Sequence, residues 1–392
     1  MLTFKLALKN LLGAGTRTWL NVILTSISFV YLLLAAGLFT GLLRYTERVV
    51  IETEIGGGAY WHPKYDPEDP FTLDDSHGPY PPEVGTQVET GEAMPVLIIQ
   101  GAIYVDGRMQ PALIKGIPPE QHVLTLPTAT LATDTDGAIP VLIGTGMSKS
   151  ADLQEGDLLT IRWRDAHGTY DADEGIVVAI MKVDNFKVDQ GQIWVPLDRL
   201  QEMAVMPGEA TYVAIAPGAT PLADPGGWRT RDADYLLTDI KEIIKSKIPG
   251  NAILIILFIL LASLGIFNSQ VLSIFRRRKE IGTLMALGMA RSRVVGLFTT
   301  EGGLHSLLAV FLAAAWGGPL LLLSATRGIP LPYDTADIGF IIGQRMYPVF
   351  SVAFLIGSMI LVASIVTIIS YLPTRRIAKM EPTEALHGRV NR

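Results

Sequence analysis

Four long runs without a charged residue constrain the fold of this chain more than any other feature. The runs are 18–43, 248–275, 302–326 and 346–374, and none contains Asp, Glu, Lys or Arg. An α-helix of about 20 residues crosses the roughly 30 Å hydrocarbon core of a bilayer, and each run exceeds that length. We therefore predict four transmembrane helices.

The composition points to the same class of protein and removes several others. Of the 392 residues, 49% are hydrophobic and only 18% are charged, which is too apolar for a soluble domain of this length. No cysteine is present, which excludes disulfides, cysteine nucleophiles and cysteine-ligated metals. The first run follows Lys5, Lys9 and Arg17 as in a signal peptide, but it is too long for one, so an uncleaved anchor is expected.

Basic residues gather in three of the segments that flank the runs. Three precede the first run, six lie between the second and third, and five follow the fourth. With Glu301, which directly precedes the third run, assigned to the rest of the chain, the acidic residues in these segments are Glu280, Glu381 and Glu384. The positive-inside rule then places both ends and the segment after the second run in the cytoplasm. The large segment between the first two runs is expected outside.

We therefore expect an α-helical membrane protein with four transmembrane helices and a mixed α/β, β-rich extracytoplasmic domain between helices 1 and 2. The expected order is a cytoplasmic elbow helix (1–18), transmembrane helix 1 (19–43), the extracytoplasmic domain and stalk (44–250), transmembrane helix 2 (251–275), a cytoplasmic loop (276–296), transmembrane helix 3 (297–326), an extracytoplasmic loop (327–346), transmembrane helix 4 (347–372) and a cytoplasmic tail (373–392).

Within the large domain, short β-rich runs alternate with turn residues. The runs are 95–107, 139–163, 174–186 and 191–203, and Gly, Pro and Asp separate them as in strands joined by tight turns. Short helices are expected at 148–153 and 197–205. Residues 235–254 have apolar side chains near helical spacing, which predicts an amphipathic stalk continuous with transmembrane helix 2.

An acidic, proline-rich stretch covers 60–83, and we expect an ordered excursion or flexible loop there rather than a strand. Its possible metal ligands are His62, Asp66, Glu68, Asp69, Asp74, Asp75 and His77. Because these residues lack EF-hand spacing, a solvated acidic loop is favoured over a metal site, with a partner-contact surface as the other alternative.

The segment 276–298 combines a basic cluster with a short apolar stripe. Ile281, Leu284, Met285 and Gly288 follow the i, i+3, i+4, i+7 spacing of one helical face. The basic flank consists of Arg276, Arg277, Arg278, Lys279, Arg291 and Arg293. Such a helix cannot bury its stripe against its own small cytoplasmic portion, so it needs a partner or the lipid surface. The residues alone leave two interpretations open: a basic loop that fixes topology, or a docking element.

Three polar residues lie in or near the membrane runs, namely Asn268, Glu301 and His305. Ionisable groups in a membrane are costly and therefore suggest function. For Glu301, near the cytoplasmic end of its run, we expect a structural contact with the basic loop. A proton or metal site at His305 is the alternative, and Asn268 is expected to hydrogen-bond to neighbouring helices.

Residues 268–302 resemble the signature of the FtsX-like permease family of ABC transporters, which includes the MacB type and the lipoprotein-releasing permeases. The matching elements are Asn268, Glu280-Ile281-Gly282, Leu284, Ala286-Leu287-Gly288, Arg293 and Glu301-Gly302. Residues 372–389, 141–161, 193–203 and 112–121 are similar to other parts of that family. The resemblance covers nearly the whole chain.

The resemblance implies a coupling helix that sits in a groove on a cytoplasmic ATPase. Its residues would be Glu280, Ile281, Gly282, Leu284, Met285, Ala286, Leu287 and Gly288. The string nearest to a Walker A motif, 144–150, has Lys149 where the second glycine should stand, so a strand-to-helix turn is expected there. ATP and Mg are therefore expected on a separate ATPase, and this chain is expected to be a transport permease without catalytic, cofactor or metal residues.

The size of the external domain is most similar to the lipoprotein-releasing (LolC/LolE-type) subunits. That type implies a mechanotransmission cycle in the bacterial inner membrane. The expected partners are an ABC ATPase dimer, a second permease copy or paralogue, membrane lipid, lipoprotein cargo and a periplasmic carrier. No nucleic-acid partner is expected. Efflux of a drug, peptide or haem stays open, as does an FtsX-like signalling complex that regulates a periplasmic partner. A membrane-embedded enzyme is disfavoured because the six histidines are scattered.

Overall fold

The computed structural model describes residues 16–238, 282–283, 285–330 and 345–378, together with 240–242, 245–246, 249–250, 252–253, 256–257, 260, 267, 271–272 and 275. These residues form two compact units. The helical unit contains the described residues of 16–42, 245–330 and 345–378, and the β unit contains those of 43–244. Helix α2 (Thr16–Val50) contributes to both and continues into a π-helical turn, η1 (Ile51–Ile55).

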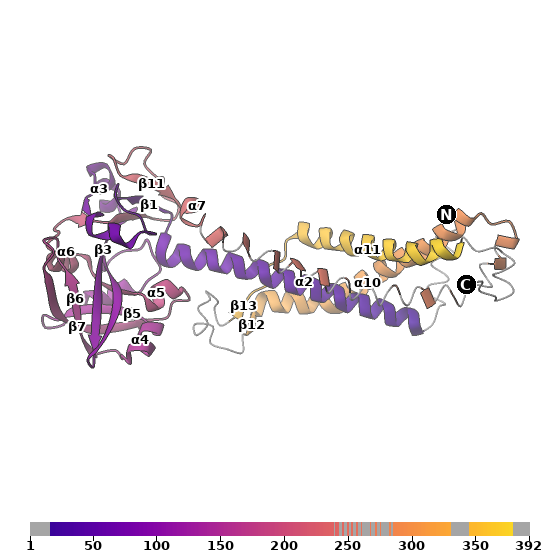
Figure 1. Cartoon of the computed structure of the whole chain (residues 1–392), viewed down its shortest axis with the longest axis horizontal. Helices are drawn as coiled ribbons and strands as arrows, with labels where there is room; N and C mark the ends of the chain where they lie inside the picture. The colour runs from indigo at the N-terminus through magenta and orange to yellow at the C-terminus, as the bar shows by residue number, and fades with distance from the viewer. Residues whose placement is uncertain are drawn as a thin grey trace. The chain divides into compact units, whose positions relative to one another are not determined.

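Nine strands of the β unit form one sheet, in the order β11-β1-β10-β3-β4-β8-β5-β7-β6 (Figure 1). The strands are β1 (Gly58–Trp61), β3 (Ala93–Val105), β4 (Arg108–Ile117), β5 (Ile139–Gly144), β6 (Leu158–Arg164), β7 (Tyr170–Met181), β8 (Gln192–Pro196), β10 (Tyr212–Ile215) and β11 (Arg229–Asp232). A separate pair joins β2 (Gly78–Pro79) to β9 (Glu209–Ala210). The β4–β8 and β5–β7 pairs are parallel, and the other pairs in the sheet are antiparallel.

Six of these strands close into a barrel, because β6 pairs with β3 as well as with β7. Strand β6 shows how the sequence specifies the inner face: Leu159, Ile161 and Trp163 are buried, and the residues between them are exposed. This period of two is the pleat of a strand with one covered face. The barrel core contains Leu97, Ile99, Ile103, Ile114, Val141, Ile143, Leu159, Ile161, Trp163, Val177, Ile193 and Val195.

The barrel is narrow, and a glycine makes room inside it. A Cβ on Gly101 would lie 2.4 Å from Ile114 Cδ1 and 2.7 Å from the Arg162 carbonyl oxygen. Neither distance allows a carbon atom, so the close approach of β3 to its two neighbours requires glycine at this position. The β3–β4 hairpin turns at Asp106 and Gly107, both with positive φ, which is the conformation of a tight two-residue hairpin loop.

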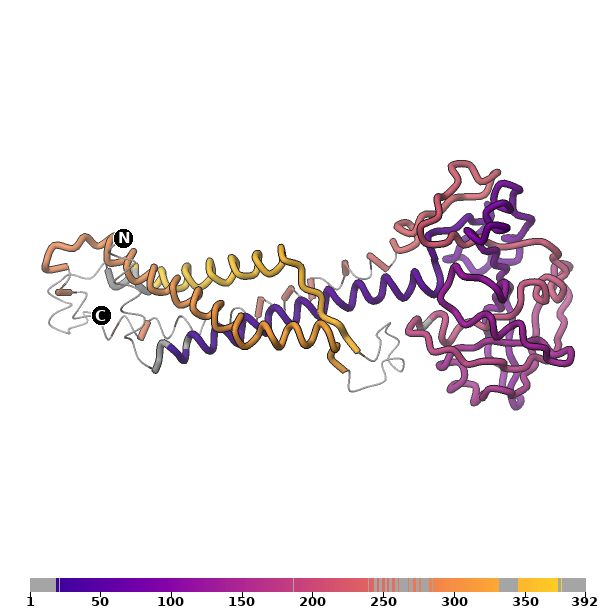
Figure 2. The backbone as a smooth tube through the Cα atoms, turned by 180° about the vertical axis from the view of Figure 1, so that it is seen from behind, coloured from indigo at the N-terminus to yellow at the C-terminus, as the bar shows by residue number. Residues whose placement is uncertain are grey.

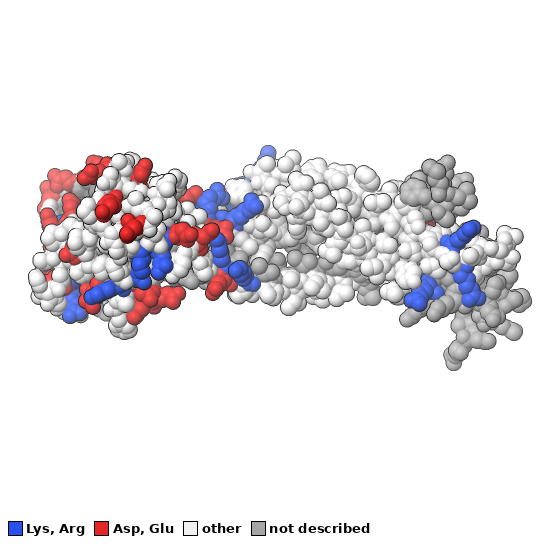
Figure 3. Space-filling model, turned by 90° about the horizontal axis from the view of Figure 1, so that it is seen from above, with Lys and Arg blue, Asp and Glu red and all other residues white. Residues whose placement is uncertain are grey.

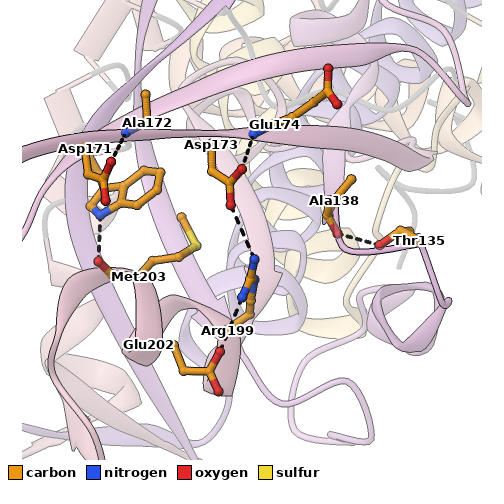
Figure 4. Close-up of polar contacts among 10 residues, drawn as sticks. Thr135, Ala138, Asp171, Ala172, Asp173, Glu174, Arg199, Glu202 and Met203 are labelled. Atoms are coloured by element: carbon orange, nitrogen blue, oxygen red, sulfur yellow. Dashed lines mark hydrogen bonds and ion pairs between the residues drawn. The ribbon is translucent and has the colours of Figure 1, made fainter.

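Short helices and turns cover the strands. They are η2 (Pro70–Asp75), α3 (Pro82–Glu89), η3 (Thr128–Ala132), α4 (Thr145–Ala151), α5 (Phe186–Gln190), α6 (Leu197–Ala204) and α7 (Ala233–Leu236). Leu200 and Met203 of α6 join the barrel core, and Trp163 Nε1 donates to the Met203 carbonyl oxygen at 2.8 Å. Arg199 of the same helix bridges Asp173 and Glu202 (Figure 4). These exposed ion pairs contribute at most about 1 kcal/mol, so burial holds α6 in place.

The helical unit contains α10 (Arg291–Arg327) and α11 (Val352–Ala378), which lie side by side (Figure 2), and the described part of α2. Three described helices are long and apolar enough to cross a membrane: Val22–Ile55, Arg291–Arg327 and Val352–Leu372. On the face drawn in Figure 3, the helices carry few charged side chains, whereas acidic and basic side chains gather on the β unit. Most of the predicted second span, 251–275, lies outside the described residues.

Small residues let the segments of the helical unit approach closely. Gly317 of α10 faces Val30 of α2, and a Cβ at that glycine would lie 2.3 Å from Val30 Cγ2. Ser26 Oγ accepts a hydrogen bond from Trp316 Nε1 at 3.3 Å. Beyond α10, β12 (Ile329–Pro330) pairs with β13 (Arg345–Met346). The described helices are thus joined by close backbone contacts, a hydrogen bond and a small hairpin.

Several elements differ in extent from their sequence patterns. The stretch 60–83 begins inside a strand, because Tyr60 and Trp61 belong to β1, and it contains η2 and β2 as well; its many Pro and Asp residues had hidden these short elements. Helix α10 begins at Arg291, before the uncharged run, and α11 continues to Ala378. Hydropathy locates the hydrocarbon region, whereas a helix can continue into water. The expected stalk 235–254 begins in α7, and its described residues from 238 onward are helical.

Candidate functional site

A short helical segment precedes α10, and a glycine ends it. Gly282, Thr283, Met285 and Ala286 are helical. The Gly288 amide donates to the Met285 carbonyl oxygen at 3.0 Å, and φ at Gly288 is +91°. A left-handed glycine is a common helix terminator. Gly288 therefore ends this helical segment before α10 begins. Its role is in the backbone conformation of the turn, and it is not a member of the apolar stripe.

The segment packs on the beginning of α10. Met285 and Met289, both half-buried, contact the buried side chains of Val294 and Phe298. Of the predicted stripe, Met285 thus packs on its own chain, whereas Ile281 and Leu284 lie outside the described residues. The first turns of α10 supply an apolar surface that hydropathy had assigned to the loop, and Gly288 allows the segment to lie against it.

Leu287 is the large apolar side chain that this packing leaves in water. It is 80% exposed, and the adjacent Ala286 is exposed as well. Leu287 is outside the i, i+3, i+4, i+7 stripe, so periodicity missed it and only the family resemblance had included it. A single exposed leucine is common on protein surfaces. Here it lies directly before the turn at Gly288.

Two arginines occupy the first turn of α10, where they do not help the helix. Arg291 and Arg293 are exposed, and the N-cap residue Ala290 provides no side-chain cap. Cations near a helix N-terminus oppose the helix dipole by about 0.3–1 kcal/mol each. Their presence is better explained by the cytoplasmic side of a membrane, by lipid headgroups or by an acidic partner surface.

Glu301 and His305 lie on α10 inside the helical unit. Glu301 is only 5% exposed, and the imidazole Nδ1 of His305 donates to the Glu301 carbonyl oxygen at 2.7 Å. This hydrogen bond of the i, i+4 pair is thus made to the backbone of Glu301. Gly303, two residues along α10 from each of them, lies against Thr367 of α11.

Several predicted site residues lie outside the described part of the chain. They are Asn268, Arg276, Arg277, Arg278, Lys279, Glu280, Ile281 and Leu284. Their assigned roles, including the contact of Glu301 with the basic loop, stay predictions.

The acidic stretch of the β unit makes contacts within the protein. Arg164 Nη1 pairs with Asp74 at 3.0 Å, Lys64 pairs with Asp75 at 3.9 Å, and His77 contacts the Glu209 carboxylate. Within the described ranges, no group of three or more His, Asp or Glu side chains is arranged to hold a metal ion. The string 144–150 forms the turn from β5 into α4, as expected.

Sequence reasoning missed a pocket of about 350 Å³ in the β unit. Aromatic side chains of Trp61, Tyr65, Tyr212 and Tyr235 line it together with a lysine, Lys115, that is 3% exposed. Lys115 alternates with apolar residues in a strand, and such a lysine is normally expected to face solvent. No pattern in one sequence marks it as buried.

Replacement of Gly288 by alanine is expected to strain the turn before α10 by about 1 kcal/mol, because alanine disfavours positive φ. Asparagine tolerates this region better and should retain more of the turn. Open space surrounds the Cβ position, so backbone strain alone separates the two variants. Thermal unfolding of the purified full chain measures the difference. Equal stability of both variants would contradict the assigned backbone role.

Comparison with known proteins gives consistent results. Residues 252–382 match the FtsX-like permease C-terminal family. The macrolide export ATP-binding/permease protein MacB of Nitrobacter winogradskyi is 31% identical over 127 residues, which are 32% of this chain and 17% of that protein. MacB of Sodalis glossinidius is 25% identical over 232 residues, or 54% of this chain and 33% of that protein.

An uncharacterized ABC transporter permease of Methanocaldococcus jannaschii is 30% identical over 131 residues, which cover 33% of this chain and 30% of that protein. The chain thus spans a third or less of the length of these curated relatives. Among solved structures, the extracellular domain of the noncanonic ABC-type transporter YknZ from Gram-positive bacteria is 11% identical. Its TM-score is 0.26, with 42% of this chain and 83% of that chain covered, which is too low to support a structural argument.

Proposed function

We propose that the chain is the permease subunit of an ABC transporter, working with a separate cytoplasmic ATPase, because residues 252–382 match the FtsX-like permease C-terminal family and parts of the chain are similar to MacB proteins. The observation that carries this proposal is the family match over 252–382, which includes the segment before α10. In that segment Leu287 is exposed while Met285 is fixed to α10. A coupling element needs both properties: an exposed anchor for the ATPase and a firm connection to a membrane helix.

The geometry suggests how force would pass from the ATPase into the membrane. A push on Leu287 would reach Val294 and Phe298 through Met285, because these side chains form one cluster. Helix α10 is continuous over 37 residues, or about 55 Å. At its far end, the guanidinium of Arg345 donates to the Arg327 carbonyl oxygen at 2.7 Å and ties α10 to the chain that enters α11. Helix α2 would carry motion onward, since it contributes to both units.

We further propose that the cargo is a lipoprotein taken from the outer leaflet of a bacterial inner membrane, with both chain ends cytoplasmic and the β unit outside. Dimerisation with a second permease copy or paralogue would create the cavity. The chain's similarity to macrolide export proteins supports efflux of a drug or peptide as the second candidate. A signalling role, in which the β unit regulates a periplasmic partner, is the third.

Affinity purification of the tagged full chain in mild detergent tests these proposals. Co-purification of an ABC ATPase together with acylated proteins is the expected result. An ATPase without acylated proteins would reject lipoprotein release and leave the permease assignment standing. Absence of any ATPase, in a preparation whose permease remains folded, would reject the permease proposal itself.

A further inference from the structure

The pocket in the β unit lies beside the ends of α2 and α7. Its lining residues are Val50, Glu54, Ile55, Ala59, Trp61, Tyr65, Asp66, Pro67, Glu68, Lys115, Lys187, Tyr212, Tyr235, Leu236, Thr238 and Ile240. All of these residues belong to the β unit. A volume of about 350 Å³ is within the range of small-molecule sites in proteins.

Lys115 is a buried lysine whose ammonium forms no ion pair with a carboxylate of the described residues. It lies on β4, directly opposite Ile98 of β3 and Trp194 of β8. Its Nζ lies 5.0 Å from the Trp194 ring centroid, and it forms no hydrogen bond or ion pair with the described residues. Burial lowers the pKa of Lys115, as expected for an ammonium removed from water without a counter-ion.

The other charged side chains that line the pocket form no ion pair with Lys115 in the described part of the chain. Glu54 lines the same pocket and attracts the ammonium, but its carboxylate accepts a hydrogen bond from Asn185 at 3.2 Å rather than pairing with Lys115. Asp66, Glu68 and Lys187 are exposed at the pocket's surface, where water screens them. The Lys115 ammonium, on a side chain only 3% exposed, is screened much less than these three groups.

Aromatic rings supply the apolar wall. The rings of Tyr65 and Tyr212 stack with centroids 6.1 Å apart, and Trp61 meets Tyr65 edge-on at 5.2 Å. Burial raises the pKa of both tyrosine hydroxyls, which therefore stay protonated and neutral. Arg231 already lies over the rings of Trp61 and Tyr235, at 5.5 and 4.3 Å from their centroids. The wall thus favours a planar or aliphatic body over a second cation.

We propose that this pocket binds a small organic carboxylate with an apolar body, whose carboxylate pairs with the Lys115 ammonium while its body contacts Trp61, Tyr65 and Tyr212. The single positive charge of the Lys115 ammonium is balanced by the single negative charge of the ligand carboxylate. A dianionic phosphate would leave excess charge beside Glu54, which is unfavourable in a poorly solvated site. The proposal goes beyond the transport function and does not depend on it.

Isothermal titration calorimetry on the full chain in lipid nanodiscs tests the proposal, with empty nanodiscs as the blank for partitioning into lipid. The probes share one ring system and differ in charge: 2-naphthoate, 2-naphthalenemethanol and 2-naphthylmethylammonium. We expect one saturable site per chain for 2-naphthoate, with affinity at least tenfold higher than for the alcohol or the ammonium. Equal or stronger binding of the ammonium, or no saturable binding of 2-naphthoate, would overturn the proposal.

Lys115→Met is the matched variant, because methionine is similar in length and apolar, so a buried charge is replaced without a cavity. It should lower the affinity for 2-naphthoate at least tenfold and leave the alcohol unchanged. Lys182→Met removes an exposed lysine outside the pocket and should change neither. Unchanged 2-naphthoate binding in Lys115→Met would also overturn the proposal. The comparison of the three probes on the unaltered chain remains decisive if that variant does not fold.

Discussion

Leu287→Asp is expected to lower the affinity of the permease for its ATPase at least tenfold and to abolish permease-dependent stimulation of ATP hydrolysis. Leu287 is 80% exposed beside a turn that Gly288 ends and that Met285 holds on α10. An apolar anchor buried in a partner's groove typically contributes about 2 kcal/mol or more. Burying a carboxylate there adds a desolvation penalty. Because the side chain is exposed in this chain, folding of the permease should be unaffected.

The measurement is pull-down of the ATPase together with its hydrolysis rate in the reconstituted complex. Leu158→Asp is the matched control: it is the same substitution at a 54% exposed leucine, located on β6 of the β unit. That control should bind ATPase normally. If Leu287→Asp retains full stimulation, the segment before α10 is not the coupling element, and the interpretation of a basic loop that only fixes topology is correct.

Gly41→Val is expected to destabilise the helical unit by about 3 kcal/mol, or to prevent its assembly. A Cβ at Gly41 would lie 2.0 Å from the Tyr347 carbonyl oxygen and 3.3 Å from Pro348 Cα. These are backbone atoms, which cannot rotate away as a side chain does, so the cost should reach the upper end of the usual 1–3 kcal/mol for overpacking. The nearby hydrogen bond from the Val349 amide to the Gly37 carbonyl oxygen, 2.9 Å long, would be disturbed as well.

Thermal unfolding of the detergent-purified chain, followed by size-exclusion chromatography, measures this effect. Gly357→Val is the control, because that glycine of α11 has no atom within 4 Å of its Cβ position. We expect its melting temperature to stay close to that of the unaltered chain. Equal behaviour of the two variants would mean that the contact of α2 with the segment before α11 does not determine stability.

The membrane class and the strands of the β unit were accessible from the sequence because they depend on local patterns. An uncharged run of 25 residues or alternation such as that in 158–164 is visible without knowing any contact. Closure of the barrel was not accessible. It requires β3 to pair with β6, more than 50 residues away, and Gly101 permits that approach only through atoms of distant strands.

The candidate coupling segment shows the same division within a few residues. The helical spacing of Met285 and the termination signal at Gly288 are local, and the family resemblance pointed to 280–288. Packing decided which apolar side chain stays exposed to water. Met285 packs against Val294 and Phe298, whereas Leu287 is 80% exposed. Periodicity describes a face of an isolated helix, whereas exposure depends on what lies against that face.

The sequence by itself determined that this chain enters a membrane, carries a large β-rich domain and resembles the FtsX-like permeases, because hydropathy, charge and motif spacing are properties of neighbouring residues. Only the tertiary structure decided that Gly41 meets backbone, that Leu287 is exposed and that Lys115 is buried among aromatic rings. Each of these depends on segments far apart in the chain, and the free energy of burying or crowding a side chain is set by those distant neighbours.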